Sequence, residues 1–272
     1  MSATVDPVPG MAYIQGTYQT AQQLLSDVGV EIGLPASPNP FTSTDTNYQQ
    51  LVIQANLVGK DLLRKWDWQL FQRTHSILTV STPPPTPSSP TYYPMPADYF
   101  KYIDQTGWNR TARLPMAGPL TPQAYEWLVG LVSNSFTIYL GFRLWSDVFA
   151  IYPSPNPSGQ EIAFEYLSRN WVQPVASLGT NPPSVDARTN FVANNGDVVL
   201  YDSVLFGRAL KLRWLTDKGF DTTAASDDLQ AAFEQAVGPD MGGQKLNLAQ
   251  AGWGMRYLDA INNVPPSGFG QM

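Results

Sequence analysis

The spacing of apolar residues changes twice along the chain, and this change restricts the possible folds more than any other feature of the sequence. Between Tyr48 and Trp66, apolar side chains recur every three or four positions, which is typical of an amphipathic helix. From about residue 68 the repeat shortens to two, as in strands, and over 197–218 the helical repeat returns. This order predicts an α+β fold, in which N- and C-terminal helices form a helical bundle and the strands form an antiparallel β-rich insertion.

Two helices are predicted before the β-rich stretch. The first covers residues 17–28, with Gly29 at the position of a C-terminal cap. The second covers residues 46–66, and Thr46 with Gln49 three positions later resembles a capping box at its start. A loop rich in proline and serine connects the two predicted helices.

The β-rich stretch contains a proline-rich segment, residues 82–96, with seven prolines that rule out a helix or a central strand. We expect this segment to form an exposed connection at a hairpin tip. Thr121 followed by Pro122 predicts the start of a short helix. Three strands joined by short turns, and hence an antiparallel meander, are then predicted over residues 135–142, 144–153 and 161–168.

The last third of the chain predicts two more helices and an extended arm. Residues 197–218 are apolar on most of the helix circumference, so several neighbours must cover that helix. Residues 223–237 predict a milder amphipathic helix. The predicted domains are a helical bundle of residues 1–68 and 190–249, a β-rich insertion of residues 69–189, and a C-terminal arm of residues 250–272.

Composition argues against several classes of function. Only 14% of the 272 residues are charged, against about 25% in an average soluble domain, while 12% are aromatic. Such a surface suits a protein that packs against neighbours. The net charge of −6 argues against tight binding of nucleic acid, because phosphate binding depends on cationic side chains. The chain has no cysteine, which excludes disulfides, thiolate catalysis and cysteine-ligated metals.

Membrane insertion and secretion are not expected. The longest apolar stretch, residues 136–152, contains Arg143 and Asp147, which a membrane span tolerates poorly. The first residues, MSATVDPVPG, lack the basic start and apolar segment of a secretory signal. We therefore expect a soluble protein that is made in the cytosol.

Candidate catalytic residues are few. His75 is the only histidine and is predicted to lie in a strand, with no Gly-x-Ser-x-Gly elbow to complete a serine hydrolase. Glu161 and Glu165 come nearest to the carboxylate pair of a glycosidase, but the same spacing is typical of a solvated strand face. Asn109–Thr111 is formally a glycosylation sequon. Since no nucleotide-binding or calcium loop is found either, we expect no enzyme activity, no metal and no cofactor.

The stretch LLRKWDWQLFQRT, residues 62–74, crowds Trp66, Asp67 and Trp68 at the point where the helical repeat ends. One interpretation is a platform for stacking on sugar rings, and the other is a packed hinge between the helical and β-rich parts. The hinge is favoured because Trp66 continues the apolar stripe of the helix and Trp68 opens the strand. Asp67 is then expected to bind free backbone groups at the joint.

Several segments of the chain follow one another in an order known from one protein family. They are AQQLLSDVGV, LLRKWDWQLFQRT, YPMPADYFKYID, WNRTARLPMAGPLTPQAYEWL and FTIYLGFRLWSDVFAIYPSPNPSGQEIAFEYLSRNWV. Over residues 17–172 this arrangement resembles the adaptor, or head-completion, proteins of the head–tail connector in tailed bacteriophages. The helical residues 197–237 fit the plan of that family, whereas the proline-rich segment 82–96 replaces the compact turn that is usual there.

The resemblance implies a structural virion protein that forms a ring, in this family usually of twelve subunits, beneath the capsid portal. Such a ring extends the DNA channel, through which DNA passes without specific binding, and it provides the attachment platform for the tail. The implied partners are the portal protein, nozzle or tail-tube proteins and further copies of the chain, with no membrane. Assembly would take place in the host cytoplasm, and the final location would be the head–tail connector of the virion.

In this family a C-terminal arm docks on the portal, which implies an interface role for the arm of this chain. Large aromatic and arginine side chains anchor protein interfaces, so the predicted partner-binding residues are Trp253, Arg256, Tyr257 and Phe269. The alternative function is that of a carbohydrate-binding virion or surface protein that uses exposed tryptophans.

Overall fold

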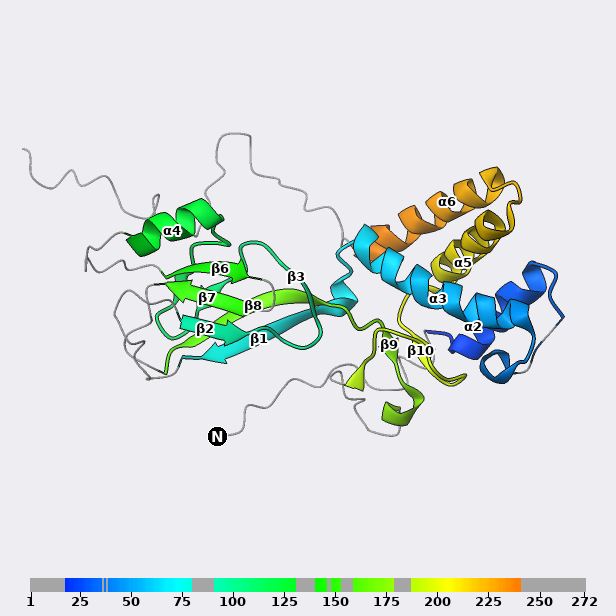
Figure 1. Cartoon of the computed structure of the whole chain (residues 1–272), viewed down its shortest axis with the longest axis horizontal. Helices are drawn as coiled ribbons and strands as arrows, with labels where there is room; N and C mark the ends of the chain where they lie inside the picture. The colour runs from blue at the N-terminus through cyan, green and yellow to red at the C-terminus, as the bar shows by residue number, and fades with distance from the viewer. Residues whose placement is uncertain are drawn as a thin grey trace, which may run out of the picture.

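The chain is a mixed α+β protein, as its sequence predicts. In Figure 1, helices α2, α3, α5 and α6 lie together on one side, and strands β1, β2, β3, β6, β7 and β8 lie with helix α4 on the other. The computed structural model describes residues 18–35, 37, 39–79, 91–130, 140–145, 148–152, 159–178 and 187–240.

Helix α2, Ala21–Glu31, begins with a capping box that was not predicted. The Thr20 side chain accepts a hydrogen bond from the Gln23 backbone N–H, and the Gln23 side chain accepts one from the Thr20 N–H. The helix continues past Gly29, so the predicted cap is wrong. A Cβ at Gly29 would lie 2.7 Å from the Tyr48 hydroxyl, and close helix packing therefore explains this glycine.

Helix α3, Thr46–Lys65, covers the residues that the apolar repeat predicts. Its N-cap is Asp45, which accepts a hydrogen bond of 2.9 Å from the Asn47 N–H, and Thr46 is already helical. The predicted capping box at Thr46 is therefore wrong. The short 3-10 helix η1, Pro40–Thr42, lies between α2 and α3.

Helices α5 and α6 follow the sheet region. Helix α5 spans Ser203–Lys218 and begins later than predicted, because Val198–Val199 form a short strand, β10. It ends at Gly219, whose φ of 75° is the left-handed conformation that glycine adopts without steric cost. Helix α6 spans Thr223–Asp240.

The helices that pack over the apolar surface of α5 belong to the same chain. Helix α5 packs against α2, α3 and α6, which explains its nearly complete apolar circumference. The same helical core takes in Leu167, Trp171 and Val172, which follow the strands in sequence. The buried residues that α5 and α6 add to it are Leu205, Phe206, Ala209, Leu210, Trp214, Leu229 and Ala232.

Two antiparallel sheets form the other half of the molecule. The central sheet has the strand order β1-β8-β4-β5, with β3 also paired to β8, and the outer sheet has the order β2-β7-β6. The central strands are β1 Gln72–Leu78, β3 Tyr99–Tyr102, β4 Trp108–Asn109, β5 Leu114–Pro115 and β8 Glu161–Ser168. The outer strands are β2 Thr91–Pro94, β6 Gly141–Trp145 and β7 Val148–Tyr152.

The predicted three-stranded meander is wrong in its pairing. Strands β6 and β7 pair with each other, but β8 lies in the central sheet between β1 and β4. Of the predicted strand 135–142, residues 135–139 lie outside the described residues, Leu140 is irregular, and Gly141 and Phe142 belong to β6. The proline-rich segment is not the tip of a hairpin as predicted, because β1 pairs with β8 and β2 pairs with β7 in the other sheet. Part of the segment is strand β2 itself, which tolerates Pro94 because it lies at a sheet edge.

Three phenyl rings join the two sheets. Phe149 of β7 stacks on Phe142 of β6 at 4.7 Å between centroids, and on Phe164 of β8 at 4.8 Å. Because β7 belongs to the outer sheet and β8 to the central sheet, this stack crosses the core between the sheets. Helix α4, Pro122–Gly130, starts at the predicted cap, where Thr121 accepts a hydrogen bond from the Ala124 N–H. Its Tyr125 packs in a separate small cluster of the outer sheet.

The chain passes from the sheets back to the helices through a tightly packed segment. Strand β9, Val172–Gln173, pairs with β10, and the 3-10 helix η3, Val175–Ser177, follows. Trp171 is fully buried against Gly59 of α3, where a Cβ would lie only 2.2 Å from the indole. The Tyr201 hydroxyl donates a hydrogen bond of 2.9 Å to the Gly59 carbonyl. These contacts hold the end of the sheet region against the middle of α3.

Candidate functional site

The predicted partner-binding residues cannot be placed. Trp253, Arg256, Tyr257 and Phe269 lie outside the described residues, which end at Asp240. Their role in binding a portal stays a prediction. Two described regions correspond to the other functional hypotheses: the junction at residues 66–68 and a hollow on the central sheet.

The junction closes on the C-terminal helix. Trp66 is the C-cap of α3, and its Nε1 donates a hydrogen bond of 2.9 Å to the Asp240 carboxylate at the end of α6. The same carboxylate accepts hydrogen bonds of 3.2 and 3.3 Å from the Gln69 backbone N–H. Asp67 instead forms an exposed ion pair of 2.8 Å with Lys101 of β3. The prediction that Asp67 binds free backbone groups at the joint is therefore wrong. Asp240 accepts that backbone hydrogen bond instead.

Trp68 is buried and has a structural role. Its Nε1 donates a hydrogen bond of 3.0 Å to the Leu62 carbonyl of α3, and its ring makes edge contacts with Tyr201 and Phe233. The 3-10 helix η2, Gln69–Phe71, separates Trp68 from β1, so the prediction that Trp68 opens the strand is wrong. A buried indole offers no face to a sugar, so Trp68 supports the hinge interpretation and not the platform.

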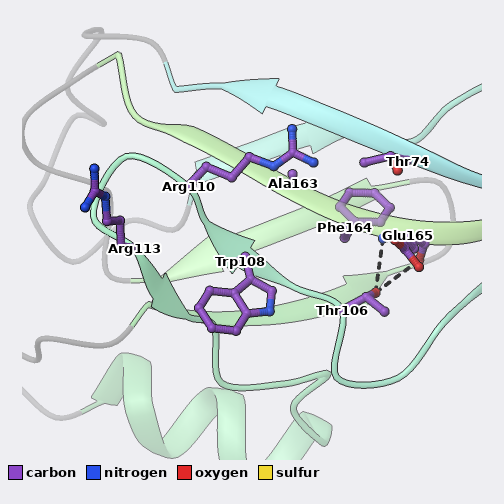
Figure 2. A pocket seen from close by; sticks show the side chains of 8 residues that line it. All are labelled: Thr74, Thr106, Trp108, Arg110, Arg113, Ala163, Phe164 and Glu165. Carbon is purple, nitrogen blue, oxygen red and sulfur yellow. Dashed lines mark hydrogen bonds between the residues drawn. The ribbon is translucent and has the colours of Figure 1, made fainter. Parts of the chain in front are cut away.

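A hollow of about 390 Å³ lies on the central sheet, beside Ala163 and Glu165 of β8 (Figure 2). Its floor follows from strand register: Trp108 of β4 and Ser76 of β1 both pair with Ala163 of β8, and cross-strand partners share a face. Ala163 is small, which leaves space beside the Trp108 ring. The lining residues are Thr74, Thr106, Trp108, Arg110, Arg113, Ala163, Phe164 and Glu165.

The β4–β5 turn carries the two arginines of this hollow and is well fixed. Asn109 accepts a hydrogen bond from the Ala112 N–H, Thr111 accepts one from the Glu161 N–H, and the Arg110 guanidinium forms an ion pair of 3.0 Å with Glu161. Asn109 is buried and bonded to the Gln160 side chain, so its amide is not presented to solvent as a glycosylation site would require.

Arg113 stands out within that turn. Its φ is 57°, a left-handed conformation that costs a non-glycine residue about 1–2 kcal/mol. Its guanidinium is exposed and, among the described residues, makes no ion pair or hydrogen bond. A glycine would adopt this backbone without strain, so the local structure does not explain the arginine.

Of the exposed tryptophans, Trp108 is the one that lines a described hollow. Trp145 is 53% exposed, but Arg143 lies over its ring at 5.0 Å and also over Tyr125 at 5.8 Å. Trp127 is 67% exposed on α4 and lines none of the described hollows. Trp108 is 36% exposed. Sequence alone did not single out Trp108 or Arg113, because their proximity depends on the pairing of β4 with β8.

The candidate catalytic residues do not form a catalytic group. Glu161 and Glu165 are four residues apart on β8, about 13 Å along an extended strand, whereas paired glycosidase carboxylates lie about 5–9.5 Å apart. Glu161 is also bound to Arg110. His75 lies edge-on to Phe164 and Tyr166, and burial lowers its pKa, with the Asp98 carboxylate acting in the opposite direction.

Within the described ranges, no group of three or more His, Asp or Glu side chains is placed to hold a metal ion. None of the helices in those ranges has the length and apolar character needed to cross a bilayer.

No protein-family model matches the chain, and no curated protein matches it either.

Proposed function

We propose that the chain is a ring-forming head–tail adaptor of a tailed bacteriophage. It binds the capsid portal, extends the DNA channel and provides the platform for the tail. The observation that carries the proposal is the layout of the chain. Helices α2, α3, α5 and α6, from both ends of the sequence, share one core, while the intervening strands form a second core to one side. This layout fits the family that the order of segments resembles.

A ring requires a surface on which neighbouring subunits meet. Helix α5 packs its apolar side chains mainly against helices of its own chain, and Val204 is its one large apolar residue that is exposed, so α5 supplies little of that surface. Exposed apolar side chains elsewhere on the helical half supply it: Ile53 and Leu57 are 62% and 40% exposed and lie one turn apart on α3. Further exposed apolar residues of this half are Val30, Phe191, Val204 and Phe220. We assign the Ile53–Leu57 stripe to the contact between subunits.

The charge of the chain supports a channel role. A net charge of −6 disfavours tight binding of DNA, so the genome slides past the ring without sticking to it. Composition agrees with extensive protein contacts, because aromatic residues are enriched at interfaces and most charged residues are depleted from their cores.

The subunit contact is tested with a double variant, Ile53→Asp with Leu57→Asp, mixed with the portal protein of the same virus. Buried carboxylates in the ring contact would be unpaired, so we expect loss of the closed assembly in native mass spectrometry. Leu78→Asp is the matched control, because Leu78 is 66% exposed but belongs to the sheet half. Equal assembly of the double variant and the control would contradict the assignment of the stripe.

The arm is tested separately by deleting residues 250–272. Retention of the ring together with weaker portal binding in a pull-down is the expected result, since the arm is assigned to the portal contact. Undiminished portal binding would contradict the role of Trp253, Arg256, Tyr257 and Phe269.

A further inference from the structure

We propose that the hollow beside Trp108 is a binding site for an oligosaccharide that carries a carboxylate, such as a chain of uronic-acid sugars. The site lies in the sheet half, and it is independent of the ring-forming role of the helical half. Four features of the hollow suit such a ligand: an aromatic ring, a cation without an ion-pair partner, a carboxylate with a hydroxyl that lack hydrogen-bond partners among the described residues, and a rigid frame.

The aromatic wall is Trp108. Its ring stands beside Ala163 and lines the hollow, and the residue is 36% exposed. Figure 2 shows Trp108 between Arg113 at one end of the hollow and Glu165 with Thr106 at the other. An indole with an open face packs against the apolar C–H face of a pyranose, while its N–H remains available for a hydrogen bond.

The cation that selects an acidic sugar is Arg113. The other arginine of the hollow, Arg110, is already paired with Glu161 at 3.0 Å. Arg113 has no ion-pair partner among the described residues and is held in a strained left-handed backbone that a glycine would satisfy better. A planar guanidinium with unused donors matches a carboxylate through two parallel hydrogen bonds.

The opposite end of the hollow offers groups for sugar hydroxyls. Across the part of the chain that the structure describes, the Glu165 carboxylate and the Thr74 hydroxyl have no hydrogen-bond partner. The two residues are directly paired across β8 and β1, so both side chains are on the same face. A carboxylate accepts and a hydroxyl both donates and accepts, which suits a ligand rich in hydroxyl groups.

The hollow is rigid enough to be a preformed site. Thr106, on its rim, donates a hydrogen bond of 2.6 Å to the Ile103 carbonyl and accepts one of 3.0 Å from the Glu165 N–H. The turn that carries Arg113 is fixed by Asn109 and Thr111. Preorganised lining groups lower the ordering cost of binding.

The test is titration of the full chain with a galacturonic-acid trisaccharide, followed by tryptophan fluorescence and calorimetry. The methyl ester of the same trisaccharide is the matched ligand, because it keeps the rings and hydroxyls and loses the charges. We expect saturable binding of the acid form at millimolar concentration and binding of the ester weaker by about tenfold or more. No saturation with the acid form, or equal binding of both forms, would overturn the proposal.

Two variants locate the site. Arg113→Gly relieves the left-handed strain, so it folds, and it should reduce binding of the acid form about tenfold while leaving the ester unchanged. Trp108→Ala should abolish binding of both forms, with its fold checked by circular dichroism. The control is Trp127→Ala, which removes an exposed tryptophan from α4, outside the hollow. Loss of binding in the control, or its survival in both site variants, would place the ligand elsewhere and overturn the proposal.

Discussion

The helical half and the sheet half of the molecule build their cores in different ways. In the helical half, Trp171 from the end of the sheet region lies on Gly59 of α3, and Tyr201 from just before α5 bonds the Gly59 carbonyl. These three residues are far apart in sequence. In the sheet half, the central element is a stack of Phe142, Phe149 and Phe164, which come from consecutive strands.

This difference indicates that the core of the helical half depends on the complete chain more than the core of the sheet half does. The phenyl stack joins residues that are close in sequence, so closing it costs less chain entropy than the contacts of Gly59 with Trp171 and Tyr201, although the central sheet also needs β1 to pair with β8. The helical core instead requires α2, the returning segment with Trp171 and the helices α5 and α6 to meet. We therefore expect the sheet half to resist perturbation of the helical half better than the reverse, and substitutions in each core test this.

Phe149→Ala should have the largest effect. Phe149 is the middle ring of the stack and is fully buried, and removing such a ring costs about 3–5 kcal/mol of unfolding free energy. Urea unfolding with hydrogen exchange would measure the loss and locate it. Phe100→Ala is the control, since Phe100 is 36% exposed on β3. A loss below about 1 kcal/mol for Phe149→Ala would mean that the stack does not hold the sheets together.

Gly59→Ala should have the second largest effect and should act on the helical core. The added Cβ would lie 2.2 Å from the Trp171 ring, which is buried and cannot retreat without moving its neighbours. Overpacking of this kind costs about 1–3 kcal/mol. Gly238→Ala is a matched control, because it lies in α6 with open space around its Cβ position, and it should be neutral or slightly stabilising. Equal stability of the two variants would contradict the close packing at Gly59.

The sequence predicted local structure better than pairing. The span of α3 and the residues of β8 follow from runs with a clear apolar period, Tyr48–Trp66 and Glu161–Ser168. The sheet membership of β8 did not follow, because the apolar alternation of a strand shows which face is buried but not which strand lies beside it. The end of α2 was misplaced since Gly29 has a packing role that only Tyr48, from another helix, reveals.

The candidate site was harder to predict than the local structure, because it too depends on which strands pair. Trp108 and Arg113 can be recognised as parts of one site only from the structure. The strand register places Trp108 beside Ala163, and the β4–β5 turn brings Arg113 to the same hollow. The hinge at Trp66–Trp68 was recognised from the change of period. Its carboxylate partner, Asp240, was missed because it is remote in sequence.

Asp240→Asn should have a smaller effect, at the joint between the halves. The carboxylate accepts from Trp66 Nε1 and from the Gln69 N–H, and weakening these charge-assisted hydrogen bonds should cost about 1 kcal/mol. Thermal unfolding reports the change. The control is Asp227→Asn, an exposed position of α6. If both variants unfold at the same temperature, Asp240 does not tie the helix end to the junction.

The smallest expected effect is a pH dependence confined to the sheet half. Burial lowers the pKa of the His75 imidazole from 6.5, so the unfolded chain binds the proton more readily than the folded chain. Stability should therefore be unaffected above pH 6.5 and should fall as the pH drops below 6.5 through the lowered pKa. Because His75 is the only histidine, its NMR titration is unambiguous. His75→Phe should remove this component, and an apparent pKa at or above 6.5 would contradict it.

The adaptor proposal is tested most directly by electron microscopy of the chain mixed with the portal protein of the same virus. The prediction is class averages with a closed ring of the chain stacked coaxially on the portal ring, with the helical halves forming the ring and the sheet halves projecting from it. Portal rings without added density, together with a chain that stays monomeric, would contradict the proposal.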